Sequence, residues 1–325
     1  MGFIQASSAA PNIKPGDVWL DDRGRPINAH GAGVIKIGEA WYMVGEYRPK
    51  DAVPGRRYVS CYSSTDLISW KFLGLPIDST APDGIGPQWI LERPKLFYNA
   101  KTKKYVMWMH IDGPLNPNET DPKKCRALKR LGVAISDTVA GPYKFVRTFN
   151  TFNTRTGDVG QFIDDDGTAY LILTDRDTKT CFIAKLSDDY LDLSEKTSVV
   201  PFNLEGGALV HYEGLYYLVA SLLSGWNPNA NKFATAKDLK GPWSEIQDIA
   251  PPEKKTYKSQ STMLVKVVGT QKTSVIFMAD QWKPSTQWDS RYLWMPLEIG
   301  NGKVWLPEPR KWTIDVKNGV TSFPP

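Results

Sequence analysis

Cysteine is scarce in this chain of 325 residues, and its three cysteines stand at wide, unrelated spacings. Cys61, Cys125 and Cys181 do not show the paired spacing of a zinc-ligand cluster, and their odd number argues against a disulfide framework. At most one bridge could form. The excess of positive charge is also small, with a formal net charge of +5. The basic runs at 123–130 and 254–258 lie in polar stretches typical of solvated loops, so we expect no nucleic-acid partner.

Long apolar runs are absent as well. No stretch reaches the length of a transmembrane helix. Residues 1–11 (MGFIQASSAAP) have neither the basic start nor the apolar middle of a signal peptide. We therefore expect no membrane partner. Either the protein is cytoplasmic, or it is exported by a signal that this sequence does not include.

Amphipathic helices are also absent from the pattern, because no helical periodicity continues for three turns. Short β-rich runs recur throughout the chain instead. The chain is 41% hydrophobic, and its 12 tryptophans exceed what a core needs, which indicates stacking surfaces. One apolar, aromatic run occurs five times: AWYMVGE at 40–46, KYVMWMH at 104–110, TAYLILT at 168–174, LYYLVAS at 215–221 and VIFMADQW at 275–282.

A second signature trails several of these runs and is typical of a turn into an outer strand: SSTDLISW at 63–70, ISDTVAGPYKF at 135–145, LSDDYLDLS at 186–194 and TAKDLKGPWSE at 235–245. A four-stranded unit repeated five times is the sequence pattern of a β-propeller. The uneven steps and the lack of any Gly-His pair argue against a regular WD-repeat array.

The sequence therefore predicts a single all-β domain over residues 1–325, a five-bladed β-propeller. We expect the blades near 25–80, 85–148, 152–197, 200–248 and 255–316. Residues 293–297 and 304–312 can finish the last blade, and residues 18–20 can complete it as a strand from the other end of the chain.

A polar position precedes each aromatic run in an otherwise apolar or glycine-rich context. These positions are Asn28 with His30, then Glu92, Asp158, Glu205 and Gln260. In a propeller this place is the start of each blade's innermost strand, and the innermost strands converge at the axis. Side chains distant in sequence would therefore meet in one pocket. Taken singly, each has a plainer interpretation: an acid paired with a nearby lysine or arginine, a core histidine, a turn acid or a polar edge.

Carboxylates and an amide around one axis, with Trp226, Trp282 and Trp288 nearby in sequence, are typical of a sugar site. Aromatic rings cover the C–H faces of sugars, and carboxylates and amides bind the hydroxyls. Glycoside hydrolysis needs one acid that protonates the leaving oxygen and, on the opposite face, a group that activates water. Glu205 is the predicted acid. Asp158 beside it would disfavour its ionisation and keep it protonated near neutral pH.

Over nearly its whole length the chain resembles glycoside hydrolase family 43, and in particular the exo-β-1,3-galactanase-like branch. The resemblance is carried by six motifs in order: INAHGAGVI with YMVGE, LERPKLFYN with YVMWMH, GDVGQFIDDDGTAYLI, LEGGALV with SGWNPN, KSQST, and MADQW with DSRYLWMPL. It implies a five-bladed propeller that hydrolyses glycosides with inversion. Glu205 then matches the family's general acid and Asp158 the carboxylate that tunes it.

The family's usual general base, an aspartate, falls where this chain has Asn28, which cannot accept a proton at ordinary pH. In the galactanase-like branch this aspartate is likewise missing. There a glutamine matching Gln260 is assigned to hold the water, and a glutamate matching Glu92 contacts the sugar. Gln260 could orient the water or act through its imidic acid form, and Glu92 as the true base remains open.

The chain departs from the branch in the sugar pocket. The acid motif is Glu205-Gly-Gly-Ala instead of Glu-Ala-Pro-Ala, and Ser224 replaces a threonine ahead of Gly225 and Trp226. Arg126 stands where the branch often has a substrate-contacting tyrosine, which could favour an acidic or branched substrate, although a solvated arginine is the plainer interpretation. The residues expected to contact substrate are Asn28, His30, Glu46, Arg126, Ser224 and Trp226.

The resemblance implies an inverting exo-acting glycosidase that releases galactose from β-1,3-galactan or a related arabinogalactan-type polysaccharide. Two alternatives stay open: an α-L-arabinofuranosidase, β-galactofuranosidase or β-xylosidase of the same family, and a propeller that binds carbohydrate without catalysis. We expect an oligo- or polysaccharide partner, a monomer and no required cofactor, with a structural calcium possible in the central channel near His30. Polymer-degrading enzymes of this type are usually exported, which favours a secreted or periplasmic location.

Overall fold

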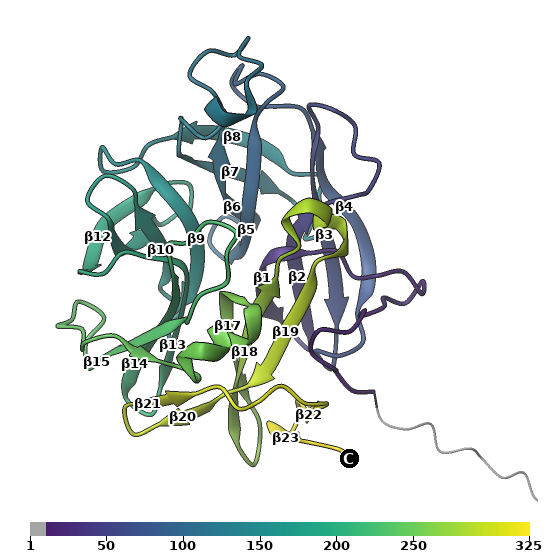
Figure 1. The fold of residues 1–325 in the computed structure, drawn as a ribbon, viewed down its shortest axis with the longest axis vertical. Coiled ribbons are helices and arrows are strands. Elements are labelled where there is room, and N and C mark those ends of the chain that lie inside the picture. The colour runs from purple at the N-terminus through teal and green to yellow at the C-terminus, as the bar shows by residue number, and fades with distance from the viewer. Residues whose placement is uncertain (1–10) are drawn as a thin grey trace, which may run out of the picture.

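The protein is a five-bladed β-propeller, as its sequence predicts. The structure is a computed structural model that describes residues 11–325, and residues 1–10, which carry the expectation about an export signal, lie outside the described residues. Five antiparallel sheets surround one central axis, and β1, β5, β9, β13 and β17 are the innermost strands (Figure 1). All three cysteines are buried and free. No helix among residues 11–325 combines the length and the hydropathy of a membrane span.

The first four blades are four-stranded meanders whose strands pair in chain order. Blade one contains β1 (His30–Ile37), β2 (Ala40–Tyr47), β3 (Arg57–Ser64) and β4 (Lys71–Ser79). Blade two contains β5 (Ile90–Asn99), β6 (Lys104–Asp112), β7 (Arg130–Ser136) and β8 (Lys144–Phe149). Blade three contains β9 (Thr156–Ile163), β10 (Ala169–Asp175), β11 (Thr180–Leu186) and β12 (Leu193–Val200). Blade four contains β13 (Leu204–Tyr212), β14 (Leu215–Leu222), β15 (Lys232–Ala236) and β16 (Gln247–Asp248).

Blade five contains β17 (Gln260–Val268), β18 (Thr273–Gln281) and β19 (Arg291–Pro296). Two small ribbons follow it: β20 (Glu298–Gly300) with β21 (Lys303–Trp305), and β22 (Thr313–Asp315) with β23 (Val320–Ser322). The short helical turns are η1 (Pro122–Lys124), η2 (Pro252–Lys254), α1 (Lys255–Lys258) and η3 (Pro284–Asp289). The five repeated aromatic runs form the second strand of each blade.

The second strands are apolar because both of their faces are covered by neighbouring blades. The core is accordingly divided into layers between blades. Met107 of blade two packs in a cluster with Val44 of blade one, whereas Val106, adjacent in sequence, packs with Leu171 of blade three. Near the axis the strands approach too closely for side chains. A Cβ on Gly160 would lie 2.0 Å from the carbonyl oxygen of Gly207 on the next blade, so glycine is required there.

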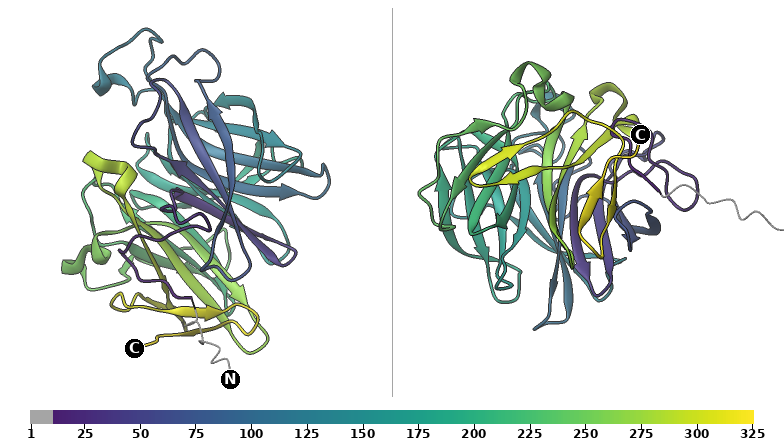
Figure 2. Two further views of the ribbon diagram at one scale, coloured as in Figure 1. Left: turned by 90° about the vertical axis from the view of Figure 1, so that its right-hand side faces the viewer. Right: turned by 90° about the horizontal axis from the view of Figure 1, so that it is seen from below.

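The propeller closes differently from the sequence expectation. Residues 18–20 form no strand of blade five, and Leu20 instead bridges to Pro26. The contacts lie earlier in the chain: Ile13 pairs with Trp312, and the Gly16 amide donates to the Tyr292 carbonyl at 2.9 Å. Trp19 contacts blade five through its side chain instead, with its ring packed edge-on against that of Trp294 at 5.0 Å. The start of the described chain and the C-terminal ribbons lie on the same side of the molecule (Figure 2).

Candidate active site

A β-bulge near the start of every innermost strand sets the direction of the polar side chains there. The pairing register shifts after His30, Glu92 and Glu205, between Thr156 and Val159 around Asp158, and just after Gln260. A bulge bends its strand and re-aims a side chain, and bulges are common beside active sites. The five positions singled out in the sequence therefore start the innermost strands, as expected.

These strand ends surround a cavity of about 340 Å³ on the axis. The four predicted catalytic residues and three of the predicted substrate-contacting residues line it: Glu92, Asp158, Glu205, Gln260, Glu46, Arg126 and Trp226. The lining also includes Trp282, one of the tryptophans noted in the sequence, and residues to which the sequence assigned no part in the site: Arg93, His110, Lys129, Gly157, Arg176 and Gly225. Residues that are 168 positions apart in the chain, such as Glu92 and Gln260, thus share one site.

Glu205 is a carboxyl group that favours its protonated form. Its side chain is only 13% exposed, and the Arg176 guanidinium stands 3.7 Å away, beyond a direct hydrogen bond. Burial and the negative charge of Asp158 raise the pKa of Glu205 to about 8, although Arg93 and Arg176 oppose the shift. A carboxylic acid that keeps its proton near neutral pH beside an ionisable partner is the arrangement that a general acid requires.

Arg93 is the central cation of the site. Its Nε lies 2.7 Å from Asp158, its Nη2 donates to Gln260 Oε1 at 2.5 Å, and its backbone amide donates to Glu46 at 2.8 Å. The side chain is 4% exposed. Buried charges are retained when they are paired and hydrogen-bonded, so Arg93 fixes three blades around the acid. Nothing in the sequence indicates this role, since Arg93 simply follows Glu92.

Gln260 has all its hydrogen-bonding positions occupied. Its Nε2 donates to Glu205 Oε1 and to Ser221 Oγ, each at 3.1 Å, and its Oε1 accepts from Trp282 Nε1 at 2.9 Å as well as from Arg93. This network fixes the orientation of the amide, with its NH₂ group toward the acid. The imidic acid form would place a proton on an oxygen that already accepts two hydrogen bonds, so the network disfavours it.

Glu92 contrasts with Glu205 because it is held ionised. Arg126 donates to both of its oxygens, at 2.6 and 3.0 Å. Burial alone would raise the pKa of Glu92, but the hydrogen bonds and charge of Arg126, with His110 and Arg48, lower it to about 2. Arg126 is therefore an ion-pair partner of the site, although its side chain is 45% exposed and it lies in a loop. The neighbouring Glu46 is paired with Arg48, and burial nevertheless raises its pKa.

Two tryptophans and one histidine complete the lining. Trp226 packs edge-on against Trp282, with ring centroids 5.4 Å apart, and 38% of Trp226 is exposed. Its ring can cover the apolar face of a sugar. His110 is 3% exposed, and its Nδ1 has no hydrogen-bond partner within the described residues.

Three residues expected to contact substrate lie outside the lining, and the structure gives each a supporting place instead. Asn28 exchanges two hydrogen bonds with the Arg48 backbone, both at 3.0 Å. His30 is 1% exposed and its Nδ1 lies 2.9 Å from an Asp280 carboxylate oxygen. The Ser224 hydroxyl accepts from Asn229 at 2.7 Å within its own turn. All three lie near the strand ends that surround the cavity, but hydrogen bonds to residues outside its lining hold their side chains.

The central channel does not suit the calcium ion considered from the sequence. The Lys95 ammonium lies there and donates to the carbonyl oxygens of Gly31 and Ala32, at 2.8 and 2.6 Å, and to the Thr262 hydroxyl at 3.1 Å. These oxygens are the type of ligand that calcium takes. Burial, with the charge of Arg93, lowers the pKa of Lys95 to about 7, and the amine occupies the place a cation would need.

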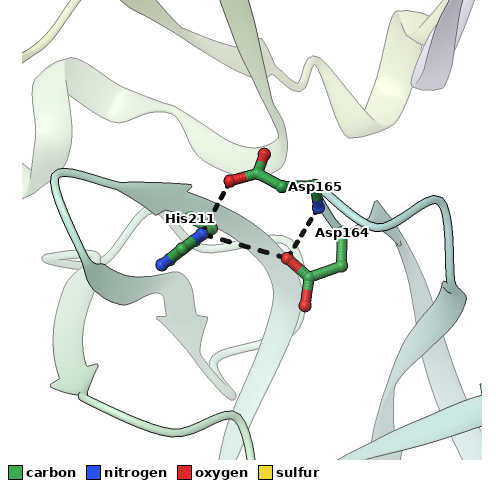
Figure 3. Close-up of side chains that lie close together, drawn as sticks. All are labelled: Asp164, Asp165 and His211. Carbon is green, nitrogen blue, oxygen red and sulfur yellow. Dashed lines mark hydrogen bonds and ion pairs between the residues drawn. The ribbon is translucent and has the colours of Figure 1, made fainter.

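A second acidic group lies at the far end of the inner strands, and Figure 3 shows its three side chains. Asp164, Asp165 and His211 have potential ligand atoms within 4.8 Å of one another. Protein partners already satisfy them. His211 contacts Asp165 at 2.8 Å, Lys266 pairs with Asp165 at 2.7 Å, and the Tyr216 hydroxyl donates to Asp164 at 2.8 Å. These three side chains therefore belong to an ion-pair network that links blades three, four and five.

The chain is similar to several proteins of known structure. One is an exo-β-1,3-galactanase from Phanerochaete chrysosporium solved with β-1,3-galactotriose, at 33% identity and a TM-score of 0.87 over 97% of this chain and 71% of that one. Another is an exo-β-1,3-galactanase from Clostridium thermocellum, at 31% identity and a TM-score of 0.85 over 96% and 68%. A third is a family 43 β-1,3-galactosidase solved with galactodeoxynojirimycin, at 32% identity and a TM-score of 0.77 over 90% of this chain and 97% of that one.

No curated protein sequence matches the chain. The model of glycosyl hydrolases family 43 matches residues 28–285, from two residues before the first innermost strand to the turn after β18. That range contains every residue of the cavity lining. The chain therefore belongs to glycoside hydrolase family 43, and it is a glycoside hydrolase.

Proposed function

We propose that the protein is an exo-acting, inverting glycosidase that releases galactose from the ends of β-1,3-galactan or a related arabinogalactan-type polysaccharide. The observation that carries the proposal is the position of the buried Glu205 in an axial cavity that it shares with Asp158, where burial and the charge of Asp158 raise its pKa to about 8. The relatives support the substrate class, because the structures reported above are of β-1,3-galactanases and a β-1,3-galactosidase. A cavity of about 340 Å³ suits one terminal sugar better than the middle of a polymer.

In the proposed reaction Glu205 donates its proton to the leaving glycosidic oxygen, and Asp158 keeps that proton in place beforehand. Trp226 covers the sugar ring. Gln260 and Glu92 have different tasks. Gln260 lies 3.1 Å from Glu205, which is shorter than the roughly 6.5–9.5 Å between the two carboxyl groups of an inverting pair, and its hydrogen-bonding positions are all occupied by protein groups. Gln260 therefore holds the Glu205 side chain in place, whereas Glu92, which is ionised, binds the attacking water and takes its proton.

The test is a time course with β-1,3-galactotriose, in which products are separated by chromatography and the first-formed anomer is read by NMR. We expect galactose and galactobiose, with α-galactose appearing first because inversion converts a β-linkage into an α-product. Cleavage that yields β-galactose first would contradict inversion. Turnover of aryl arabinofuranosides, galactofuranosides or xylosides without turnover of galactosides would contradict the substrate. Binding of galactotriose without any turnover would show a carbohydrate-binding propeller.

A further inference from the structure

A second cavity of about 260 Å³ adjoins the first one, and we call it the arginine groove. It lies between blades one and two and is closed on one side by the turn η3 of blade five. Glu46, Glu92 and Arg126 line both cavities, so the Glu92–Arg126 ion pair forms the boundary between them. A substituent on a sugar held in the axial cavity would therefore pass directly into the groove.

The groove is rich in cations. Arg48, Arg56, Arg57 and Arg126 line it, together with only two carboxylates, Glu46 and Glu92. Three of the four arginines have acidic partners: Arg48 pairs with Glu46, Arg126 with Glu92, and Arg56 with Asp78 at 2.7 Å.

Arg57 is the exception. No carboxylate among residues 11–325 lies within ion-pair distance of it, and its Nη1 donates only to the Arg56 carbonyl, at 2.7 Å. The side chain is half-buried, with its guanidinium 6.0 Å from the centre of the Trp89 ring. Burial and the like charge of Arg48 lower the pKa of Arg57, although the more distant charge of Glu92 opposes the shift. An unpaired guanidinium in a concave site is a ready partner for a carboxylate.

The groove also offers an aromatic surface. Trp288 lines it and is 43% exposed, with the Lys50 ammonium 5.3 Å from its ring. Tyr47 and Tyr58 line the groove too, with ring centroids 6.2 Å apart. An aromatic ring for the C–H face of a sugar and a free arginine for a negative charge together favour a sugar acid over a neutral sugar or an inorganic anion.

We propose that the arginine groove is a subsite for a uronic acid carried as a branch on the galactan chain, with Arg57 binding its carboxylate and Trp288 its ring. This rests on the proposed function for the axial cavity. Because Arg126 is engaged with Glu92, we assign the preference for acidic substrates to Arg57 instead of Arg126. The protein would thereby release galactose next to acidic branches that a neutral pocket would reject.

The test compares two β-1,3-galactan oligosaccharides that carry the same branch, one ending in a uronic acid and the other in its carboxyl-reduced, neutral form. The wild type should show a kcat/KM about tenfold higher on the acidic substrate, as expected for one hydrogen-bonded charge pair, and the ratio should fall with added salt. The substitution Arg57→Gln should bring the ratio to about one, whereas Arg57→Lys should retain part of it.

The matched control is Arg310→Gln, which removes the same charge from an exposed arginine that lies over Phe323 and not in the groove. It should leave the ratio unchanged. A wild-type ratio of one, or a ratio that survives Arg57→Gln, would overturn the subsite. A sulfated branch preferred over the uronic acid would overturn its assignment to a carboxylate. Unbranched β-1,3-galactobiose separates the two proposals, because its resistance to the wild type would contradict the proposed function and not the groove.

Discussion

The Nε2 atom of Gln260 lies 3.1 Å from Oε1 of Glu205, so the amide and the acid form one hydrogen-bonded unit. The amide oxygen is held by Trp282 at 2.9 Å and by Arg93. A donor at this distance stabilises the ionised form of Glu205, while Asp158 and burial act in the opposite direction. The acid is therefore poised between groups that hold its proton and groups that release it.

Replacing Asp158 should shift the basic limb of the pH–rate profile. The rate falls as pH rises through the pKa of Glu205, about 8, because the proton donor is lost. The charge of Asp158 raises that pKa, so Asp158→Asn should move the fall in kcat/KM to lower pH. Kinetics on β-1,3-galactobiose from pH 5 to 10 measure it. Asp188→Asn, at an exposed residue paired with Lys101, is the control and should not move the limb. A basic limb that stays at the same pH in both variants would show that Asp158 does not raise the pKa of Glu205.

Glu205 should make the folded protein less stable at neutral pH than a neutral residue would. Its pKa is about 8 in the folded protein against an ordinary value of 4.5, so between these values the folded state binds more protons than the unfolded state. Stability is therefore lost as pH rises through this window. Glu205→Gln should be more stable than the wild type by roughly 1–2 kcal/mol at pH 8 and equally stable at pH 4. Urea unfolding at the two pH values checks this, and an equal difference at both would contradict it.

The sequence allowed the fold and much of the cavity to be predicted because both follow from repetition. Apolar second strands recur where two blades cover them, and a polar residue recurs at the inner strand start, as with Glu92 and Gln260. Arg93 could not be identified, since its partners Asp158 and Gln260 come from other blades. The direction of the His30 side chain could not be predicted either, because it is determined by Asp280, which is 250 residues away in the chain.

Arg93 should be the most costly residue of the site to replace. Arg93→Met would leave Asp158 without its ion-pair partner and Gln260 without one donor in a buried region. Removing one member of a buried pair typically costs about 3–5 kcal/mol. Urea unfolding should show a loss of this size, with a raised KM for galactobiose. Arg155→Gln, which breaks an exposed pair with Asp177, should cost less than about 1 kcal/mol. Equal losses in the two variants would mean that Arg93 is not the central cation described here.

Arg126 should set the acidic limb of the profile. Its two hydrogen bonds help to lower the pKa of Glu92 to about 2, so Glu92 stays ionised far below neutral pH. Arg126→Ala should raise that pKa and move the loss of kcat/KM on the acid side to higher pH. Glu92→Gln should reduce kcat by about a hundredfold or more and abolish the limb. If the acidic limb persisted in Glu92→Gln, another group and not Glu92 would accept the proton of the water.

The central claim is that Glu205 is the proton donor, and the dependence on leaving group tests it most directly. Wild type and Glu205→Gln are compared on β-1,3-galactobiose, whose leaving hydroxyl needs a proton, and on 2,4-dinitrophenyl β-galactoside, whose leaving group departs without one. We expect Glu205→Gln to lose about a thousandfold in kcat/KM on galactobiose and less than about tenfold on the activated galactoside, while its affinity for galactobiose is kept. Equal losses on both substrates would show that Glu205 does not donate the proton.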